Sequence, residues 1–345
     1  MAIYNRLMTL SLLQTQQLAW PVAWNTVFGR QAPLLIEIGF GGGHFLVDLA
    51  QKRPFANILG VEISLPALER GQRKIKMAAL SNVRLLQSDA RALLQALCAP
   101  QSVDGVIINF PDPWPKANHH HRRLISVDFL HLLATRMVAG SRLDIATDHA
   151  AYAEVITAAV EATPYFHSRL PSTFVTNDDE RLRTKYEQIG LDEGRVCHYY
   201  KWERNDLPAP NIFPVPKELP MPHVVLQSPL GLDAIEEKYA QWHVAADGCH
   251  ISFMELFRAH EGKMLFVETY LREEPLAQRL GLLVRQRESG NYVISLHELG
   301  FPRPTAGVHL AIGHLAQWLL GLHEENTVLH HNLQQGILNT RQLPL

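Results

Sequence analysis

The sequence predicts an α/β protein with two domains, a doubly wound parallel sheet followed by a smaller α+β domain. Three observations support this prediction. The chain has 345 residues, which corresponds to two domains at about 150 residues per domain. Apolar runs alternate with helical patterns before residue 207, whereas strand-like runs follow one another after residue 222. Six prolines separate the two parts, between Leu207 and His223.

Five apolar runs in the first part have the length of buried strands, and three segments between the first four runs have helical spacing. The runs are residues 34–38, 58–63, 83–87, 103–109 and 142–146, and the helical segments are 44–52, 66–80 and 90–97. A strand that is followed by a helix and then by another strand predicts a parallel sheet with crossover connections. The runs are apolar on both faces, as in a sheet that helices cover on both sides.

The proline-rich segment 207–222 predicts an extended connector, because proline fixes φ and lacks a backbone N–H. We therefore expect domains at residues 1–206 and 223–345. The second domain contains strand-like runs at 223–227, 250–258, 264–271, 281–287 and 292–297, with a hairpin turn at 288–291. A last helix carries one apolar stripe from Val308 to Leu322, so we expect it to cover one face of this sheet.

The two parts differ in charge. Residues 1–206 contain 22 Lys and Arg against 20 Asp and Glu, whereas residues 207–345 contain 10 against 14. A net charge of −2 argues against a polycationic nucleic-acid coat but not against a local basic surface. Because the second part is acidic, we expect it to form a homodimer or to bind a protein partner rather than to be the main phosphate-binding surface.

Cysteine use and hydropathy indicate the compartment. The three cysteines Cys98, Cys197 and Cys249 form no C-x-x-C pair, which excludes a disulfide framework and the usual zinc spacings. The apolar stretches are shorter than the roughly 20 residues of a membrane helix. The three histidines of 119–121 lie in one loop without a remote partner, so we expect no metal site. These observations predict a cytoplasmic protein without a membrane segment.

A glycine-rich turn follows the first strand, in Glu37-Ile-Gly39-Phe-Gly41-Gly-Gly43. Such glycines allow a tight turn and the close approach of a ligand. The dinucleotide pattern G-x-G-x-x-G is not complete, because His44 occupies its last position. S-adenosylmethionine fits this variant, since its ammonium and sulfonium are cationic and a nearby carboxylate attracts them. A purely structural turn and an NAD site are the alternatives.

Two further carboxylates follow the next two strands. Glu62 lies 19 residues after Gly43, where an acidic residue accepts hydrogen bonds from ribose hydroxyls. Asp89 follows the third strand, where it can accept from the adenine amino group. Because the carboxyl ends of parallel strands meet at one edge of the sheet, these residues predict a nucleoside site there.

A stiff loop follows the fourth strand, in Asn109-Phe-Pro-Asp112-Pro-Trp114-Pro-Lys116. Its three prolines would hold Asp112, Trp114 and Lys116 in fixed positions at the mouth of the same crevice. Trp114 could stack on a base or simply pack against the prolines. Two shorter motifs, Thr147-Asp148 and Thr184-Lys-Tyr-Glu187, come later in the chain.

With these motifs the sequence resembles the bacterial tRNA (guanine-N7)-methyltransferase family. The resemblance covers residues 33–204 and rests on the following elements: Glu37-Ile-Gly-Phe-Gly, Gly60-Val-Glu62, Asn109 to Lys116, His120-x-Arg-Arg-Leu124, Thr147-Asp148, Thr184-Lys-Tyr-Glu187 with Gly190, and Tyr200 to Arg204. It implies a Rossmann-like class I methyltransferase sheet and S-adenosylmethionine as methyl donor. It also implies that the acceptor is a guanine at position 46 in the variable loop of tRNA.

The resemblance also implies roles for individual residues. The cofactor would contact Glu37, Glu62, Asp89 and Asp112, beside the loop glycines Gly39 and Gly41. Asp112 would in addition act in catalysis. The tRNA substrate would be held by Lys116, Asp148, Thr184 and Glu187.

The chemistry of guanine agrees with these roles. N7 carries a free lone pair at neutral pH, so catalysis consists mainly of alignment and of carboxylates near the charge that methylation creates. The loop after Lys116 continues with Ala117 and Asn118, whereas the family has basic residues there. Two alternatives therefore stay open: a cofactor- and RNA-binding protein without turnover, and a methyltransferase that acts on another RNA or on a protein.

Overall fold

The computed structural model describes residues 11–13, 15, 18–179, 181, 183–260, 262–299 and 302–338. The chain forms two compact units, Met1–Pro214 and Val215–Leu345. The division between the units lies inside the proline-rich segment 207–222. None of the described helices is long and apolar enough to cross a membrane.

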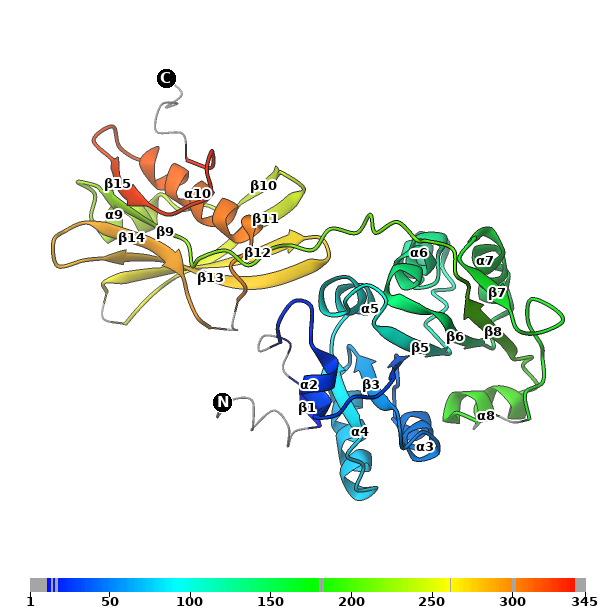
Figure 1. The fold of residues 1–345 in the computed structure, drawn as a ribbon. Helices are drawn as coiled ribbons and strands as arrows, with labels where there is room; N and C mark the ends of the chain where they lie inside the picture. Colours follow the sequence, from blue (N-terminus) through cyan, green and yellow to red (C-terminus); the bar gives the residue numbers. More distant parts are fainter. Residues whose placement is uncertain are drawn as a thin grey trace. The chain divides into compact units, whose positions relative to one another are not determined.

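Within the described residues, the first unit contains an eight-stranded sheet with the order β1-β4-β3-β2-β5-β6-β8-β7 (Figure 1). The strands are β1 (Leu12–Leu13), β2 (Leu34–Ile38), β3 (Asn57–Glu62), β4 (Val83–Gln87), β5 (Val103–Asn109), β6 (Met137–Thr147), β7 (Phe166–Ser168) and β8 (His198–Arg204). Pairing is parallel from β1 to β6, and β8 and β7 add two antiparallel strands. The predicted doubly wound parallel sheet is confirmed.

Helices cover both faces of this sheet. They are α2 (Trp24–Phe28), α3 (His44–Lys52), α4 (Leu65–Met77), α5 (Ala90–Ala92), the π-helix η2 (Leu93–Leu97), the 3-10 helix η3 (Ala117–Arg122), α6 (Val127–Arg136), α7 (Ala150–Ala162) and α8 (Lys185–Asp192). Successive residues along a strand point to opposite faces of the sheet, and a hydrophobic core lies on each face. Ile58 packs toward α3 and α4, whereas the adjacent Leu59 packs into the larger core that contains η2, α6 and α7.

Two predicted helix boundaries differ from the structure. The helix expected over 66–80 ends at Met77, because Ala79 has a φ of +52° and so leaves the helical conformation. The helix expected over 90–97 is divided into α5 and the π-helix η2.

The second unit is an antiparallel sheet with the strand order β10-β11-β12-β13-β14-β9-β15 in the part that the structure describes. Its elements are β9 (His223–Gln227), α9 (Leu232–Glu237), β10 (Trp242–Ala246), β11 (Cys249–Arg258), β12 (Met264–Glu273), β13 (Leu276–Gln286), β14 (Tyr292–Leu296), α10 (Ala306–Leu320) and β15 (Thr327–His331). Helix α10 buries Val308, Ile312 and Leu315 in the core on one face of the sheet. The predicted α+β domain with a covering helix is confirmed.

Candidate cofactor and active site

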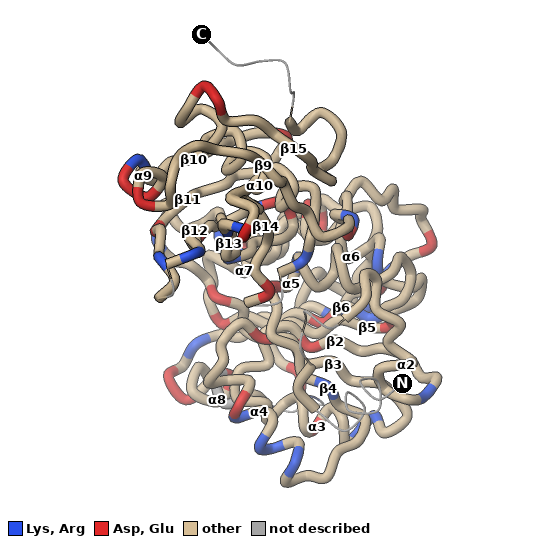
Figure 2. The backbone as a smooth tube through the Cα atoms, turned by 90° about the vertical axis from the view of Figure 1, so that its left-hand side faces the viewer, with Lys and Arg blue, Asp and Glu red and all other residues tan. Residues whose placement is uncertain are grey.

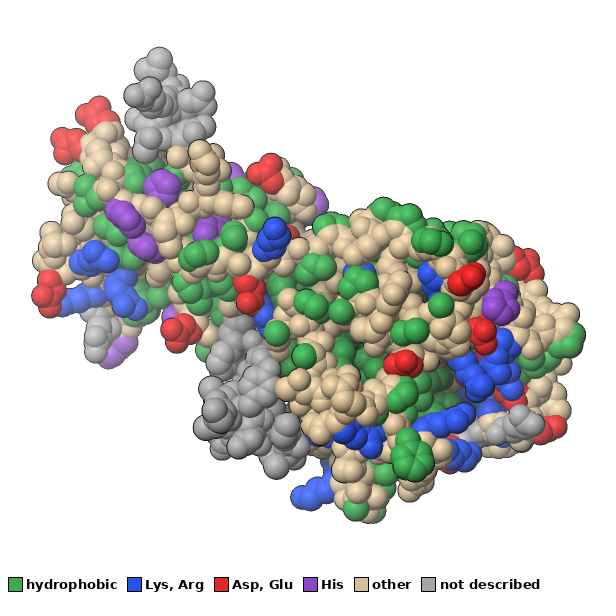
Figure 3. All heavy atoms as spheres, in the orientation of Figure 1, with side chains coloured by type: hydrophobic (Ala, Val, Ile, Leu, Met, Phe, Trp, Pro, Cys, Tyr) green, Lys and Arg blue, Asp and Glu red, His purple; other side chains and the backbone are tan. Residues whose placement is uncertain are grey.

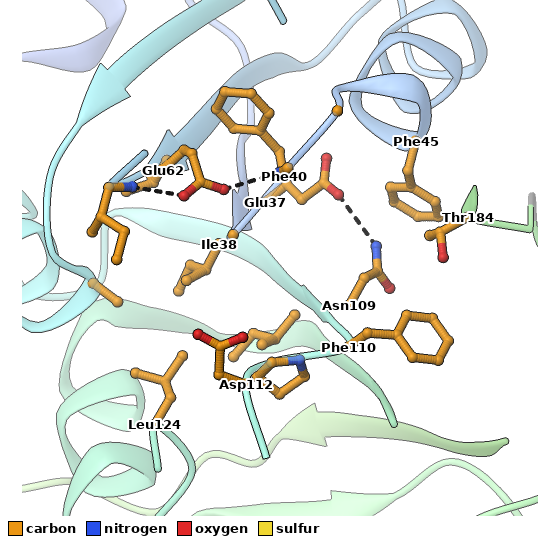
Figure 4. A pocket seen from close by; sticks show the side chains of 18 of the residues that line it. Glu37, Ile38, Phe40, Phe45, Glu62, Asn109, Phe110, Asp112, Leu124 and Thr184 are labelled. Atoms are coloured by element: carbon orange, nitrogen blue, oxygen red, sulfur yellow. Dashed lines mark hydrogen bonds between the residues drawn. The ribbon is translucent and has the colours of Figure 1, made fainter. Parts of the chain in front are cut away.

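A cavity of about 870 Å³ lies at the carboxyl ends of β2, β3, β4 and β5. Eight of the ten predicted site residues line it: Glu37, Gly39, Gly41, Glu62, Asp89, Asp112, Asp148 and Thr184. Figure 4 shows side chains from these strand ends around the cavity. Lys116 and Glu187 do not line it. The structure therefore brings together carboxylates that are far apart in the sequence.

Glu37 is the most deeply buried carboxyl group of the cavity. Its side chain is 2% exposed, and Asn109 Nδ2 donates a hydrogen bond of 3.2 Å to Oε1 (Figure 4). Burial raises the pKa of Glu37 to about 8, although Asn109 and the Arg181 guanidinium favour the charged form. Its Oε2 is buried and has no hydrogen-bond partner among the described residues. A buried acceptor without a partner is costly, so this oxygen is suited to a cationic donor from a ligand.

Glu62 holds the glycine-rich loop in place. Its Oε2 accepts from the Gly41 backbone N–H at 3.0 Å, and its Oε1 accepts from Ile63 and Ser64 at 2.9 and 3.0 Å. A carboxylate has about four lone-pair positions, so one remains for a ribose hydroxyl. Gly39 and Gly41 have φ of +72° and +52°, and no heavy atom lies within 4 Å of a Cβ built on either. The loop thus leaves open space beside the carboxylate.

Asp89 has a structural role that the sequence did not predict. It is the N-cap of α5, and its Oδ1 accepts from the backbone N–H groups of Arg91 and Ala92 at 2.8 and 3.1 Å. The cap fixes the orientation of the carboxylate. Its Oδ2 makes no such contact in the described part of the chain and remains available at the cavity wall.

The stiff loop 109–116 at the end of β5 presents an exposed carboxylate. Phe110 and Trp114 have φ of +51° and +43°, which is a strained conformation for residues with a side chain. Between them Asp112 is exposed and lines the cavity. The Arg122 guanidinium lies 5.0 Å from the centre of the Trp114 ring, and His119 meets the same ring edge-on. Trp114 is therefore partly packed by its own loop, and Asp112 is held at the cavity by a rigid support.

A polar network connects the cofactor side of the cavity to the segment before α8. Arg181 donates to Asn109 Oδ1 at 2.8 Å, while Asn109 Nδ2 donates to Glu37. The Nε of Arg181 also lies 3.4 Å from Oε2 of the fully buried Glu187. Tyr199 donates its hydroxyl to the other oxygen of Glu187 at 2.8 Å. Glu187 thus anchors its segment instead of reaching the cavity.

Sequence reasoning assigned no role to Asn109 or Arg181. Asn109 stood in the quoted motif, directly after an apolar strand, and this position was the available signal. Arg181 had no comparable signal, because its partner is 72 residues away in the sequence. Thr184 caps α8, and its hydroxyl and the Glu187 carboxylate form a reciprocal capping box. The motif Thr184-x-x-Glu187 therefore has a helix-starting role as well as a place beside the cavity.

Asp148 lies at the cavity wall in an ion pair with Arg195, with 2.9 Å between Oδ2 and Nε. Gly190 lies against this pair: a Cβ there would come within 3.0 Å of Asp148 Oδ2 and 3.3 Å of Arg195 Nε. Lys116 is exposed at the N-terminus of η3, outside the cavity lining. The pair thus brings a guanidinium to the substrate side of the cavity, and Gly190 makes room for it.

Basic side chains surround the cavity entrance. Arg70 and Lys74 of α4 line it together with Arg122 and Arg195, and Figure 2 marks basic residues along α4. The Lys74 amino group also donates to the carbonyl of Gly42, so it supports the glycine-rich loop. In the described residues no group of three or more His, Cys, Asp or Glu side chains is arranged to hold a metal ion.

The comparison with known proteins matches this geometry. A family model described as "Putative methyltransferase" matches residues 31–199. The tRNA (guanine-N(7)-)-methyltransferase of Thermus thermophilus is 34% identical over 294 residues, which cover 85% of this chain and 91% of that protein. The chain belongs to the tRNA (guanine-N7)-methyltransferase family. The predicted resemblance is confirmed, and with it the class I methyltransferase fold with S-adenosylmethionine as methyl donor.

Members of this family differ in how much of the chain they share. The enzyme of the same name from Deinococcus radiodurans is 32% identical over 84% of this chain and 89% of its own length. The one from Thermotoga maritima is 38% identical over 51% of this chain and 55% of its own length. The alignments with the Thermus thermophilus and Deinococcus radiodurans enzymes span 294 and 295 residues and are longer than the unit Met1–Pro214. They therefore extend into the second unit, which at least these two relatives share.

Proposed function

We propose that this chain transfers the methyl group of S-adenosylmethionine to N7 of guanine 46 in the variable loop of tRNA. The observation that supports this most strongly is the single cavity in which Glu37, Glu62 and Asp112 meet, in a member of this family. The cavity combines a buried acceptor without a partner, an open glycine loop and an exposed carboxylate. We place the reaction in the cytoplasm, in agreement with three unpaired, buried cysteines.

The residues present fit S-adenosylmethionine. Among the described residues the Oε2 of Glu37 is an acceptor without a partner, and a cationic ammonium would satisfy it. Glu62 has one lone-pair position left for the ribose, and Asp89 Oδ2 is available for the adenine amino group. The open space above Gly39 and Gly41 lets a ligand lie directly on the backbone.

When bound, the cofactor supplies an electrophilic methyl group on a sulfonium. The chain's own residues then have two tasks, because the N7 lone pair needs no base to release it. They hold the guanine in line with the methyl group, and they stabilise the positive charge that appears on the base. We assign the second task to Asp112, which is exposed at the cavity on a rigid loop. Asp148 is the candidate acceptor for the guanine N1–H and N2–H groups.

The RNA contacts follow from the basic side chains around the cavity. Arg70, Arg122 and Arg195 line the entrance and can neutralise phosphates beside the target base. Figure 3 shows Lys and Arg side chains gathered on one face of the first unit. Lys116 lies outside the cavity, so we assign it a phosphate contact rather than a contact to the guanine.

A methylation assay with two transcripts tests this function. The full-length protein is incubated with labelled S-adenosylmethionine and an unmodified tRNA transcript that has G46, and the product nucleotide is mapped. A transcript with A46 is the matched control. We expect N7-methylguanosine at position 46 of the first transcript only.

Other results would contradict the proposal in distinct ways. Cofactor binding without product from any tRNA would indicate a binding protein without turnover. Product at another nucleotide, or in a protein, would change the acceptor. A homodimer or a protein partner through the second domain stays a prediction from its charge, and the elution volume of the purified protein tests the dimer.

A further inference from the structure

The sheet of the second unit has one covered and one uncovered face. The paired residues Leu265, Val284, Ile294 and Val224 form a row that is buried in the same core as α10 and α9. Side chains alternate between the two faces of a strand, so the residues between these point to the opposite face. No described helix of the second unit packs against that opposite face.

The uncovered face carries aromatic rings. Phe257, Phe266, Leu283, Ser295 and His223 are paired with one another in a row across five strands. Phe257 is 53% exposed, and its ring centre lies 6.2 Å from that of Phe266. Phe257 thus offers an apolar surface to solvent, whereas Phe266 is half-buried and Leu283 in the same row is buried.

The position of Phe266 explains a glycine in the middle of β13. A Cβ built on Gly281 would lie 2.1 Å from the Phe266 ring. The ring therefore lies on the backbone of the neighbouring strand, and a larger residue would displace it. His297 meets the same ring edge-on at 5.8 Å between ring centres. The rings are thus held in fixed positions on the sheet.

The next row of the same face carries one arginine and one histidine among apolar residues. Met264, Arg285, Val293, Val225 and His330 are paired across the sheet. Arg285 is exposed and has no carboxylate partner among the described residues; its guanidinium contacts only the sulfur of Met264 at 3.8 Å. Figure 3 shows histidine side chains on the second unit over β9, β14 and β15.

Arg287 extends this positive charge toward the histidines. The rings of His223 and His330 are stacked at 5.3 Å between centres. The pKa of His223 is lowered, first by burial and then by the neighbouring His330, Arg287 and His331. A lowered pKa leaves His223 mainly neutral at pH 7, so the positive charge of this site comes from Arg285 and Arg287. Such a site favours an anion.

Several acidic residues of the second unit lie away from this face. Asp233 and Glu236 on α9 pair with Arg258, and Glu273 accepts from Thr305 next to α10. On the uncovered face the rows contain one carboxylate, Glu268, which pairs with Arg279 at 3.1 Å. The paired rows of the uncovered face thus hold few carboxylates, although Glu274 pairs with Arg272 in the turn after β12 and Glu288 follows Arg287 in the chain.

We propose that this surface binds RNA through phosphates and bases. We name it the arginine–aromatic face and define it by Phe257, Phe266, Arg285, Arg287, His223 and His330. Arginines without carboxylate partners would contact phosphates, and the exposed rings would stack on unpaired bases. An acidic protein would match the charge, but interleaved rings and cations on an open sheet fit unpaired nucleotides better. That the RNA is tRNA rests on the function proposed above.

The test is tRNA binding by full-length variants, measured at several salt concentrations without methyl transfer. In the double variant Arg285→Glu, Arg287→Glu, we expect the Kd for tRNA to rise at least tenfold. We expect the slope of log Kd against log salt to fall by about two. Phe257→Ala should weaken binding about tenfold through the loss of stacking. Lys238→Glu, a single charge reversal at the exposed C-cap of α9 and half the charge change of the double variant, should leave the Kd within about twofold.

Unchanged S-adenosylmethionine affinity and melting temperature verify that the variants are folded. If the double variant binds tRNA with the affinity and salt slope of the wild type, the inference is overturned. The same result is expected if the face binds a protein instead of RNA. If the double variant weakens tRNA binding but Phe257→Ala does not, only the stacking contact is overturned. If the wild type forms N7-methylguanosine and the double variant binds tRNA with unchanged affinity, only this inference is contradicted. If the double variant binds tRNA more weakly but the wild type forms no product, only the proposed function is contradicted.

Discussion

Glu37 is predicted to couple cofactor binding to the release of a proton. Its pKa is raised to about 8 by burial in the structure without ligand, so the carboxyl group is mainly protonated at neutral pH. A cationic ammonium next to its unpartnered Oε2 would favour the carboxylate again. Binding of S-adenosylmethionine should therefore release a proton, and affinity should increase with pH.

The size of the effect follows from the pKa. At pH 7 a group with a pKa of about 8 is about 90% protonated, so about 0.9 proton leaves for each cofactor bound. The affinity should then be about ninefold higher at pH 7 than at pH 6. In Glu37→Gln both effects should disappear, because the amide has the same shape but does not titrate in this range.

Calorimetry in buffers of different ionisation enthalpy measures the proton count directly. A pH-independent affinity in the wild type, or the same proton release in Glu37→Gln, would refute the reasoning. Stability without ligand provides a second check. The folded state holds the proton more tightly than the unfolded state, so this contribution is present below about pH 4.5 and is lost as the pH rises toward 8. Glu37→Gln should lack that loss.

Three further substitutions, one of them with a matched control, test the rest of the site. Asp112→Ala should lower kcat at least about 100-fold and shift the melting temperature by less than about 1 °C, because the side chain is exposed; normal kcat would remove it from catalysis. Lys116→Ala should reduce the salt slope of tRNA binding by about one, and an unchanged slope would reject a phosphate contact. Arg181→Met should destabilise the fold by about 3 kcal/mol, since it leaves the buried Glu187 without its cation. Arg183→Met is the control: it removes an exposed ion pair with Asp179 at 4.0 Å and should lower the free energy of unfolding by less than about 0.5 kcal/mol. Equal losses of unfolding free energy for the two variants in urea would refute the network.

The buried strands were predictable because their residues are apolar on both faces. The predicted runs 34–38, 83–87 and 103–109 have the same bounds as β2, β4 and β5. The edge strands β10 and β15 were not predicted. Their partly exposed residues alternate with polar ones and include Trp242, His243 and His330, so they lack a continuous apolar run.

The carboxylates of the site were predictable for a topological reason. Glu37, Glu62 and Asp89 follow successive parallel strands, and parallel strands place such residues at one edge. The pairing of Asn109 with Arg181 could not be predicted, because it depends on how the segment before α8 folds back over the sheet. The net charge of the second domain does not show which face each charge occupies.

The most direct test of the central claim is an experimental structure of the protein with S-adenosylmethionine bound. The claim is that Glu37, Glu62 and Asp112 hold the methyl donor in one cavity. We expect its amino-acid part at Glu37, its ribose at Glu62 and its methyl group facing the side of Asp112. A cofactor found outside this cavity, or inside it without contact to Glu37 and Glu62, would contradict the account.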